Sequence, residues 1–183
     1  INDKTQLSEK PCRLVLVGAY EDELDPIKPE TREMIDKMPE IVWAGPMYGD
    51  DLRACYASAD CFVFPSYREG FPNTVIEAGA MELPCIVTDI NGCNEIIVDS
   101  GSKIQVSGSK IQGASDLHIC PNGIIIPSKN AEAIKEAMVW MLEHEEERKL
   151  MGQKGRQMVS ERFEQGFVRQ QLYDFYRTVL KES

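Results

Sequence analysis

The sequence predicts an α/β protein with a Rossmann-like parallel sheet and helices on both faces. Short apolar runs, typical of buried parallel strands, alternate along the chain with segments of helical periodicity. The length of 183 residues, with 43% hydrophobic residues, suits one domain of ordinary size with a full core. We therefore treat residues 1–183 as one domain with a parallel sheet.

Each expected element follows from the spacing of its apolar residues. Strands are expected at residues 13–18, 41–45, 60–66, 85–89 and 123–126. Helices are expected from Pro29 to about 38, at 49–58 and 74–83, and briefly through 95–97. Three more helices are expected within 130–182, the first capped by Asn130, the second over about 145–162 and the third carrying an apolar stripe from Phe167 to Leu180. No Gly-x-Gly-x-x-Gly follows Val17, which disfavours a dehydrogenase.

The most informative stretch joins strand 60–66 to helix 74–83. It reads Arg68-Glu69-Gly70-Phe71-Pro72-Asn73-Thr74-Val75-Ile76-Glu77. A strand, a short loop and a helix form the place where an open α/β sheet binds its ligand. Gly70 lets the backbone approach a ligand, and Pro72 suits the first helical position. The N–H groups that follow, with the helix dipole, make an anion site.

Two carboxylates bracket this loop. Glu69 precedes the turn and Glu77 lies one to two turns inside the helix. Ionised carboxylates accept hydrogen bonds from hydroxyl groups. The layout therefore suits a diphosphate at the helix start with hydroxyl-bearing groups on either side.

This stretch resembles the signature of two glutamates separated by seven residues in the group 1 (family 4) retaining glycosyltransferases, which have the GT-B fold. Two glutamates at this spacing mean little alone, but the surrounding sequence agrees in order. It includes Phe64-Pro65-Ser66, Glu69-Gly70-Phe71-Pro72-Asn73, Glu77-Ala78, Leu83-Pro84, Thr88-Asp89 and Asn94-Glu95-Ile96-Ile97. The resemblance covers nearly all of the chain as the second, donor-binding domain of such an enzyme, except residues 99–121.

The resemblance implies a role for each residue of the site. Glu69 would be catalytic, because it would stabilise the charge that develops on the transferred sugar. Glu77 would bind the two ribose hydroxyls of a nucleotide-diphosphate sugar. The donor sugar and diphosphate would contact Gly70, Phe71, Pro72, Asn73 and Thr74, and the base would contact Gly18, Gly45, Pro46 and Met47. The competing interpretations are solvated carboxylates and ordinary turn glycines.

In the resembled family the leaving diphosphate helps to deprotonate the acceptor. The resemblance therefore implies no enzymic nucleophile, no cofactor and no metal, and the metal-binding Asp-x-Asp of other glycosyltransferases is absent here. Two alternatives stay open: a sugar-nucleotide epimerase or phosphorylase of the same fold, and a non-catalytic scaffold.

The beginning of the chain departs from the family pattern. The family domain opens with one more strand and helix, which supply an Arg and a Lys to the diphosphate, and Lys4, Lys10 and Arg13 do not match them. We interpret the chain as a piece of a longer protein whose N-terminal domain binds the acceptor. Alone it should bind donor weakly and turn nothing over. Strand 13–18 would then pair with strand 60–66, with the insertion or with a second copy.

Two other regions depart from an ordinary domain. A hexapeptide at 100–105 is repeated at 107–112, so more than 20 residues separate helix 95–97 from the next strand. Their Gly and Ser content favours a mobile loop, with a hairpin of 103–106 against 110–117 as the second choice. The last helix packs across the first domain in the resembled family, and here it could equally cover its own sheet.

The net charge and the cysteines limit the classes of partner and of site that this chain can have. The net charge of −10 disfavours nucleic acid and anionic membrane surfaces, and no apolar run is long enough to span a bilayer. We expect a cytoplasmic protein, with any membrane association through the N-terminal domain. Six cysteines without a Cys-x-x-Cys pair indicate reduced core thiols. A metal site at 118–120 is disfavoured because no second ligand pair has suitable spacing.

Overall fold

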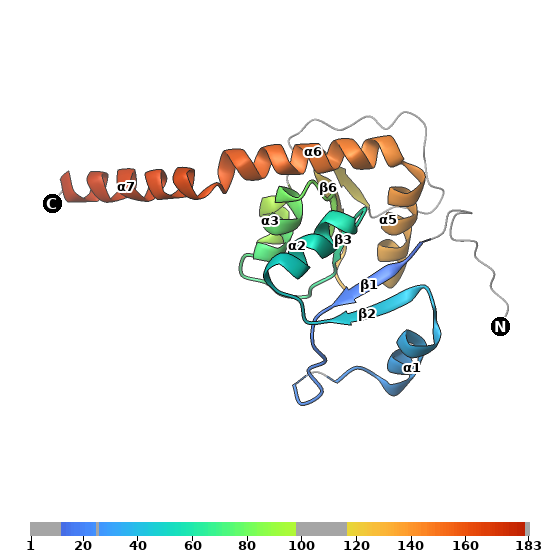
Figure 1. Ribbon diagram of the computed structural model, residues 1–183. Helices are drawn as coiled ribbons and strands as arrows, with labels where there is room; N and C mark the ends of the chain where they lie inside the picture. Colours follow the sequence, from blue (N-terminus) through green and yellow to red (C-terminus); the bar gives the residue numbers. More distant parts are fainter. Residues whose placement is uncertain (1–11, 25, 98–116, 182–183) are drawn as a thin grey trace. The chain divides into compact units, whose positions relative to one another are not determined.

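The computed structural model describes residues 12–24, 26–97 and 117–181 (Figure 1). The chain divides into two compact units, Ile1–Ala57 and Ser58–Ser183. In the first unit, β1 (Leu14–Val17) and β2 (Ile41–Gly45) pair in parallel, with α1 (Pro29–Lys37) between them in sequence. Helix α2 (Gly49–Ser58) follows and buries Tyr56.

The second unit contains a four-stranded sheet. Its strand order is β3 (Phe62–Phe64), β4 (Cys85–Thr88), β6 (Gly123–Ile126) and β5 (His118–Cys120). The first three strands are parallel and β5 is antiparallel to β6. Every residue of β4 and β6 is buried, which is typical of parallel strands covered on both faces. The predicted α/β fold class is confirmed.

Five helices accompany this sheet. They are α3 (Asn73–Ala80), α4 (Cys93–Ile96), α5 (Ala131–Glu143), α6 (Glu145–Arg162) and α7 (Gln165–Lys181). The main core lies between the sheet and α5 with α6, where Ile86 of β4 joins Trp140 and Met151. The neighbouring residue Cys85 faces the other way, with its thiol 4.0 Å from the carbonyl oxygen of Val75 in α3. Successive residues of β4 therefore pack against helices on opposite faces of the sheet.

Strand β5 was not predicted. Its three residues were assigned to the insertion at 99–121, yet they pair with β6 through a tight turn at Pro121-Asn122. The buried Asn122 amide donates to the carbonyl of Ile96 at 2.9 Å and ties this turn to α4. The repeated hexapeptide and the alternative hairpin at 103–117 lie outside the described residues, apart from Leu117.

At each end of the chain the structure contradicts one of the alternatives that the sequence left open. Strands β1 and β3 belong to different sheets, so 13–18 does not pair directly with 60–66. Helix α7 does not cover its own sheet, because every described side chain on it is exposed and it reaches outward from α6 (Figure 1). Its apolar stripe is therefore open, at Phe167, Val168, Leu172, Phe175, Tyr176, Val179 and Leu180.

All six cysteines are free, and three are fully enclosed in the core, namely Cys85, Cys93 and Cys120. Within the described ranges, no helix has the length and apolar character needed to cross a membrane.

Candidate active site

The loop between β3 and α3 forms the centre of the candidate site. Pro72 is the N-cap of α3, with φ −78° and ψ 103°, so the helix begins at Asn73. The expectation that Pro72 occupies the first helical position is wrong by one residue, because its extended ψ keeps it outside the helix. The Val75 N–H bonds back to the Pro72 carbonyl at 3.2 Å. The beginning of a helix is where backbone N–H groups and the helix dipole favour an anion.

Glu69 is half-buried and held by a neighbour. The Ser66 hydroxyl donates a hydrogen bond to Oε1 of Glu69 at 2.8 Å. The Thr88 hydroxyl, at the end of β4, in turn donates to the backbone carbonyl of Ser66. Ser66 and Thr88 both belong to the motif that resembles the family signature, but the sequence predicted no role for either.

A turn after β4 packs directly behind this loop. Gly92, with φ +80°, lies so close that a Cβ atom there would be 2.5 Å from the Gly70 carbonyl oxygen. The next residue, Cys93, is fully buried. Burial, and after it the negative charge of Glu69, raises the pKa of the Cys93 thiol to about 11. The thiol therefore lies within the electrostatic reach of the Glu69 carboxylate.

The outer side of the loop is open to solvent. Gly70, Phe71 and Asn73 are exposed, and so is Glu77 in the second turn of α3. The Phe71 ring is 42% exposed and makes an edge contact with Phe163 at the end of α6, with ring centroids 5.6 Å apart. The loop is thus anchored at its back and accessible at its front.

In the first unit, the structure brings two of the predicted base-pocket residues together. The Gly18 N–H donates to the Gly45 carbonyl at 3.0 Å, where β1 and β2 end. The indole N–H of Trp43 donates to the Gly18 carbonyl at 3.1 Å, and its ring lies 4.4 Å from that of Tyr20. Of the other two predicted residues, Pro46 is exposed and Met47 is half-buried.

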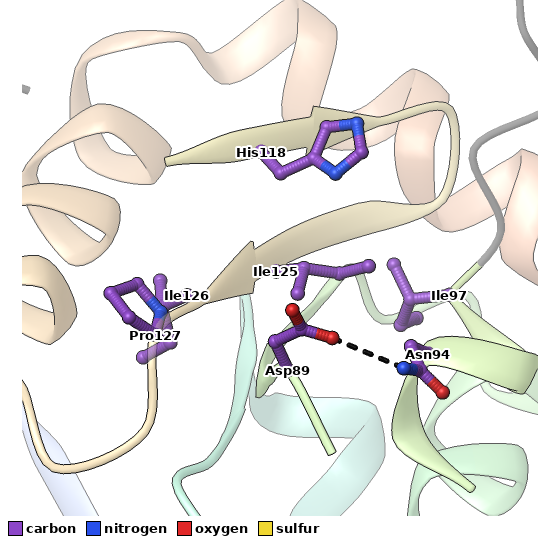
Figure 2. A pocket seen from close by; sticks show the side chains of 7 residues that line it. All are labelled: Asp89, Asn94, Ile97, His118, Ile125, Ile126 and Pro127. Atoms are coloured by element: carbon purple, nitrogen blue, oxygen red, sulfur yellow. Dashed lines mark hydrogen bonds between the residues drawn. The ribbon is translucent and has the colours of Figure 1, made fainter. Parts of the chain in front are cut away.

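A separate hollow of about 480 Å³ lies where β4 and β6 end (Figure 2). Its lining combines hydrogen-bonding and apolar side chains, from Asp89, Asn94, Ile97, His118, Ile125, Ile126 and Pro127. The Asn94 amide donates to the Asp89 carboxylate at 3.1 Å. None of the predicted site residues lines this hollow. Its polar lining comes from Asp89 and Asn94, which the sequence motif includes without a predicted role, and from His118 of β5.

Metal-ligating side chains are dispersed over the described part of the chain. Across the part of the chain that the structure describes, no three His, Cys, Asp or Glu side chains gather as an ion site. His118 and Cys120 lie on β5, where their side chains point to the same face, but no third ligand type joins them in the described ranges.

The fold and this loop can be compared with known proteins. A family model described as "Glycosyl transferases group 1" matches residues 2–144. The chain therefore belongs to the group 1 glycosyltransferase family.

Two curated relatives illustrate the likeness. The capsular polysaccharide biosynthesis glycosyltransferase CapM of Staphylococcus aureus is 28% identical over 93% of this chain and 39% of its own length. The putative teichuronic acid biosynthesis glycosyltransferase TuaC of Bacillus subtilis is 30% identical over 76% of this chain and 30% of its own length. The chain thus spans well under half of each relative.

Solved structures share the fold. Sucrose-phosphate synthase from Thermosynechococcus elongatus aligns with a TM-score of 0.70 and 22% identity, over 93% of this chain and 39% of that one. HepE of Anabaena in complex with UDP aligns with a TM-score of 0.71 and 18% identity, over 91% of this chain and 41% of that one. At these identities the likeness shows the fold alone.

Proposed function

We propose that this chain carries the donor half of an enzyme that transfers a glycosyl group from a nucleotide-diphosphate sugar to an acceptor, with retention of configuration. The observation that carries the proposal is the β3–α3 connection, where half-buried Glu69 and exposed Glu77 flank the first turn of a helix. The diphosphate would accept hydrogen bonds from the first-turn N–H groups, where the helix dipole favours an anion. Glu77 would accept from the ribose hydroxyls, and Glu69 would stabilise charge on the sugar ring.

The relatives support a role in polysaccharide or glycoconjugate synthesis. CapM and TuaC are named for capsular polysaccharide and teichuronic acid biosynthesis. HepE was solved with UDP and with UDP-glucose, which supports a nucleotide-sugar donor. The assignment of Gly18, Gly45, Pro46 and Met47 to the base stays a prediction about the first unit.

One alternative is weakened by a specific observation. A non-catalytic scaffold would have an occluded loop at 69–77, whereas Gly70, Phe71 and Glu77 are exposed. An epimerase or phosphorylase of the same fold would also use an open loop. An assay that separates sugar transfer from epimerisation and from phosphorolysis discriminates between these reactions.

The first experiment measures nucleotide binding by this chain. We expect one of UDP, GDP and ADP to raise the melting temperature at millimolar concentration, with the other two as controls for the base. Two basic donors expected from the family pattern have no match, so affinity should be roughly two to four decades weaker than with both. Low-micromolar affinity would contradict this weak binding, and the absence of any shift would contradict the donor site.

The second experiment assigns the two carboxylates in the complete gene product. Glu69→Gln should abolish most transfer while leaving donor binding nearly intact. Glu77→Gln should weaken donor binding about ten- to a hundredfold, because a charged hydrogen-bond acceptor is lost. Glu143→Gln, on the exposed end of α5, is the matched control and should change neither. The anomeric configuration of the product, read by NMR, tests retention.

A further inference from the structure

A pair of hydroxyl groups links the buried sheet to Glu69. Thr88 is the last residue of β4, is 1% exposed and is paired with Ile126 of β6. Its hydroxyl donates to the carbonyl of Ser66, which follows β3 by two residues. The Ser66 hydroxyl then donates to Glu69 Oε1 at 2.8 Å. Two short contacts therefore connect a rigid strand to the carboxylate.

The direction of the second bond is fixed by chemistry. An ionised carboxylate can only accept hydrogen bonds, so the single hydroxyl proton of Ser66 must point at Glu69. The Arg68 carbonyl lies 3.4 Å from the same hydroxyl and competes poorly, because it is farther away and uncharged. Within the described ranges, the Ser66 hydroxyl is the one hydrogen-bond donor to Glu69.

The loop that carries Glu69 is packed from behind. Gly92 closes the back of the loop against Gly70, and the buried Cys93 thiol lies in the field of Glu69. A loop residue without such support would sample several rotamers, and a misplaced group loses catalytic effect steeply. The hydrogen bonds of Ser66 and Thr88 therefore have a use beyond filling the core, because they can orient the Glu69 side chain.

We propose that Ser66 is a positioning residue for Glu69, and that Thr88 holds Ser66 in place. Ser66 occupies Oε1 and fixes the plane of the carboxylate, so that the second oxygen faces the transferred sugar. The inference rests on the proposed function, since it assigns Glu69 to the sugar. On this proposal Ser66 and Thr88 affect the rate of transfer through Glu69, without contacting the substrate.

The test compares hydroxyl-deleting and hydroxyl-keeping variants of the complete gene product. Ser66→Ala should lower kcat about ten- to a hundredfold, as expected for loss of a hydrogen bond to a charged group. Its donor Kd and melting temperature should stay close to those of the parent. Ser66→Thr, which keeps the hydroxyl, should recover most of the rate. Equal rates for parent and Ser66→Ala would overturn the proposal.

Thr88 offers a matched pair in which packing and hydrogen bonding predict opposite orders. Thr88→Val keeps the buried volume and loses the hydroxyl, whereas Thr88→Ser loses a methyl group and keeps the hydroxyl. We expect Thr88→Ser to be the more active variant. A role in packing alone predicts that Thr88→Val is better, because it leaves no cavity, and that order would overturn the role of Thr88.

A double-mutant cycle separates positioning from general damage. In a Glu69→Gln background, Ser66→Ala should cause little further loss of the residual rate, because its effect passes through Glu69. An undiminished loss in that background counts against the inference. If the parent transfers sugar and Ser66→Ala has the same rate, only this inference is wrong. If the parent shows no transfer activity, the proposed function and this inference are both wrong.

Discussion

Gly92 lies against the carbonyl of Gly70 so closely that a Cβ atom on it would be 2.5 Å from that oxygen. The same Cβ atom would also lie 3.0 Å from Pro72 Cδ and 3.1 Å from Phe71 Cα. The turn after β4 is thus the rear wall of the candidate site. A side chain at this position would have to push the loop forward.

Gly92→Ala should therefore damage both folding and donor binding. The position has φ +80°, which an L-residue adopts at a cost, and the clash is with backbone atoms that cannot rotate away. We expect a loss of at least about 2 kcal/mol in the free energy of unfolding, measured by urea denaturation. Gly70→Ala is the control, because nothing lies within 4 Å of its Cβ position and its φ is not positive. Equal stability of the two variants would contradict the close contact.

Two glycines of α6 should respond in opposite ways. A Cβ atom on Gly152 would lie 2.0 Å from the Glu82 carbonyl oxygen, whereas on Gly155 the nearest atom would be 3.6 Å away. Gly152→Ala should destabilise the protein by about 2 kcal/mol or more, since two backbones must separate. Gly155→Ala should be neutral or stabilise it by up to about 1 kcal/mol, from the better helix propensity of Ala. The melting temperatures of both variants, compared with that of the parent, test this prediction.

Asn122 should contribute to stability through one buried hydrogen bond. Its amide is 5% exposed and donates to the Ile96 carbonyl at 2.9 Å. Asn122→Ala leaves that carbonyl without its donor and should cost about 1–3 kcal/mol in urea denaturation. Asn91→Ala, at an exposed position of the neighbouring turn, should cost less than about 0.5 kcal/mol. If both variants lose the same free energy of unfolding, the Asn122 hydrogen bond does not contribute to stability.

The Cys93 thiol should make stability depend on alkaline pH. Its pKa rises from the ordinary 9.0 to about 11 on folding, through burial first and the charge of Glu69 second. Between these values the folded state keeps the proton and the unfolded state loses it. The free energy of unfolding is therefore unaffected below about pH 9 and falls as pH rises towards 11, by an amount on the order of 2 kcal/mol.

Cys93→Ala provides the comparison for this alkaline loss. Groups that do not interact with Cys93 titrate in both proteins and cancel in the difference. The pKa of Cys85 is raised by burial first, then by Cys61 and Cys93, so its contribution changes slightly in the variant. The stability gap between parent and variant should shrink from about pH 8 to about pH 10.5. A gap that is constant over this range would mean that the thiol is not held protonated by the fold.

The prediction from sequence succeeded where a contiguous run encodes the element. The apolar runs of β4 and β6 and the helical spacing of α6 were read to within a residue or two. The prediction failed for β5, because a three-residue strand is defined by its partner β6 and carries no periodicity of its own. It left the packing of α7 open, since an apolar stripe shows that a helix can be covered but not by what.

The sequence by itself determined the order of strands and helices and the position of two glutamates around a Gly-Phe-Pro-Asn turn, because these depend on neighbours along the chain. Only the tertiary structure decided that Ser66 donates to Glu69, that Thr88 supports Ser66 and that Gly92 closes the loop from behind. Those relationships depend on strand register, on side-chain rotamers and on how closely two turns approach. Ser66 and Glu69 are close in sequence, but the partners of Thr88 and Gly92 are distant in sequence, so no local pattern can specify those two contacts.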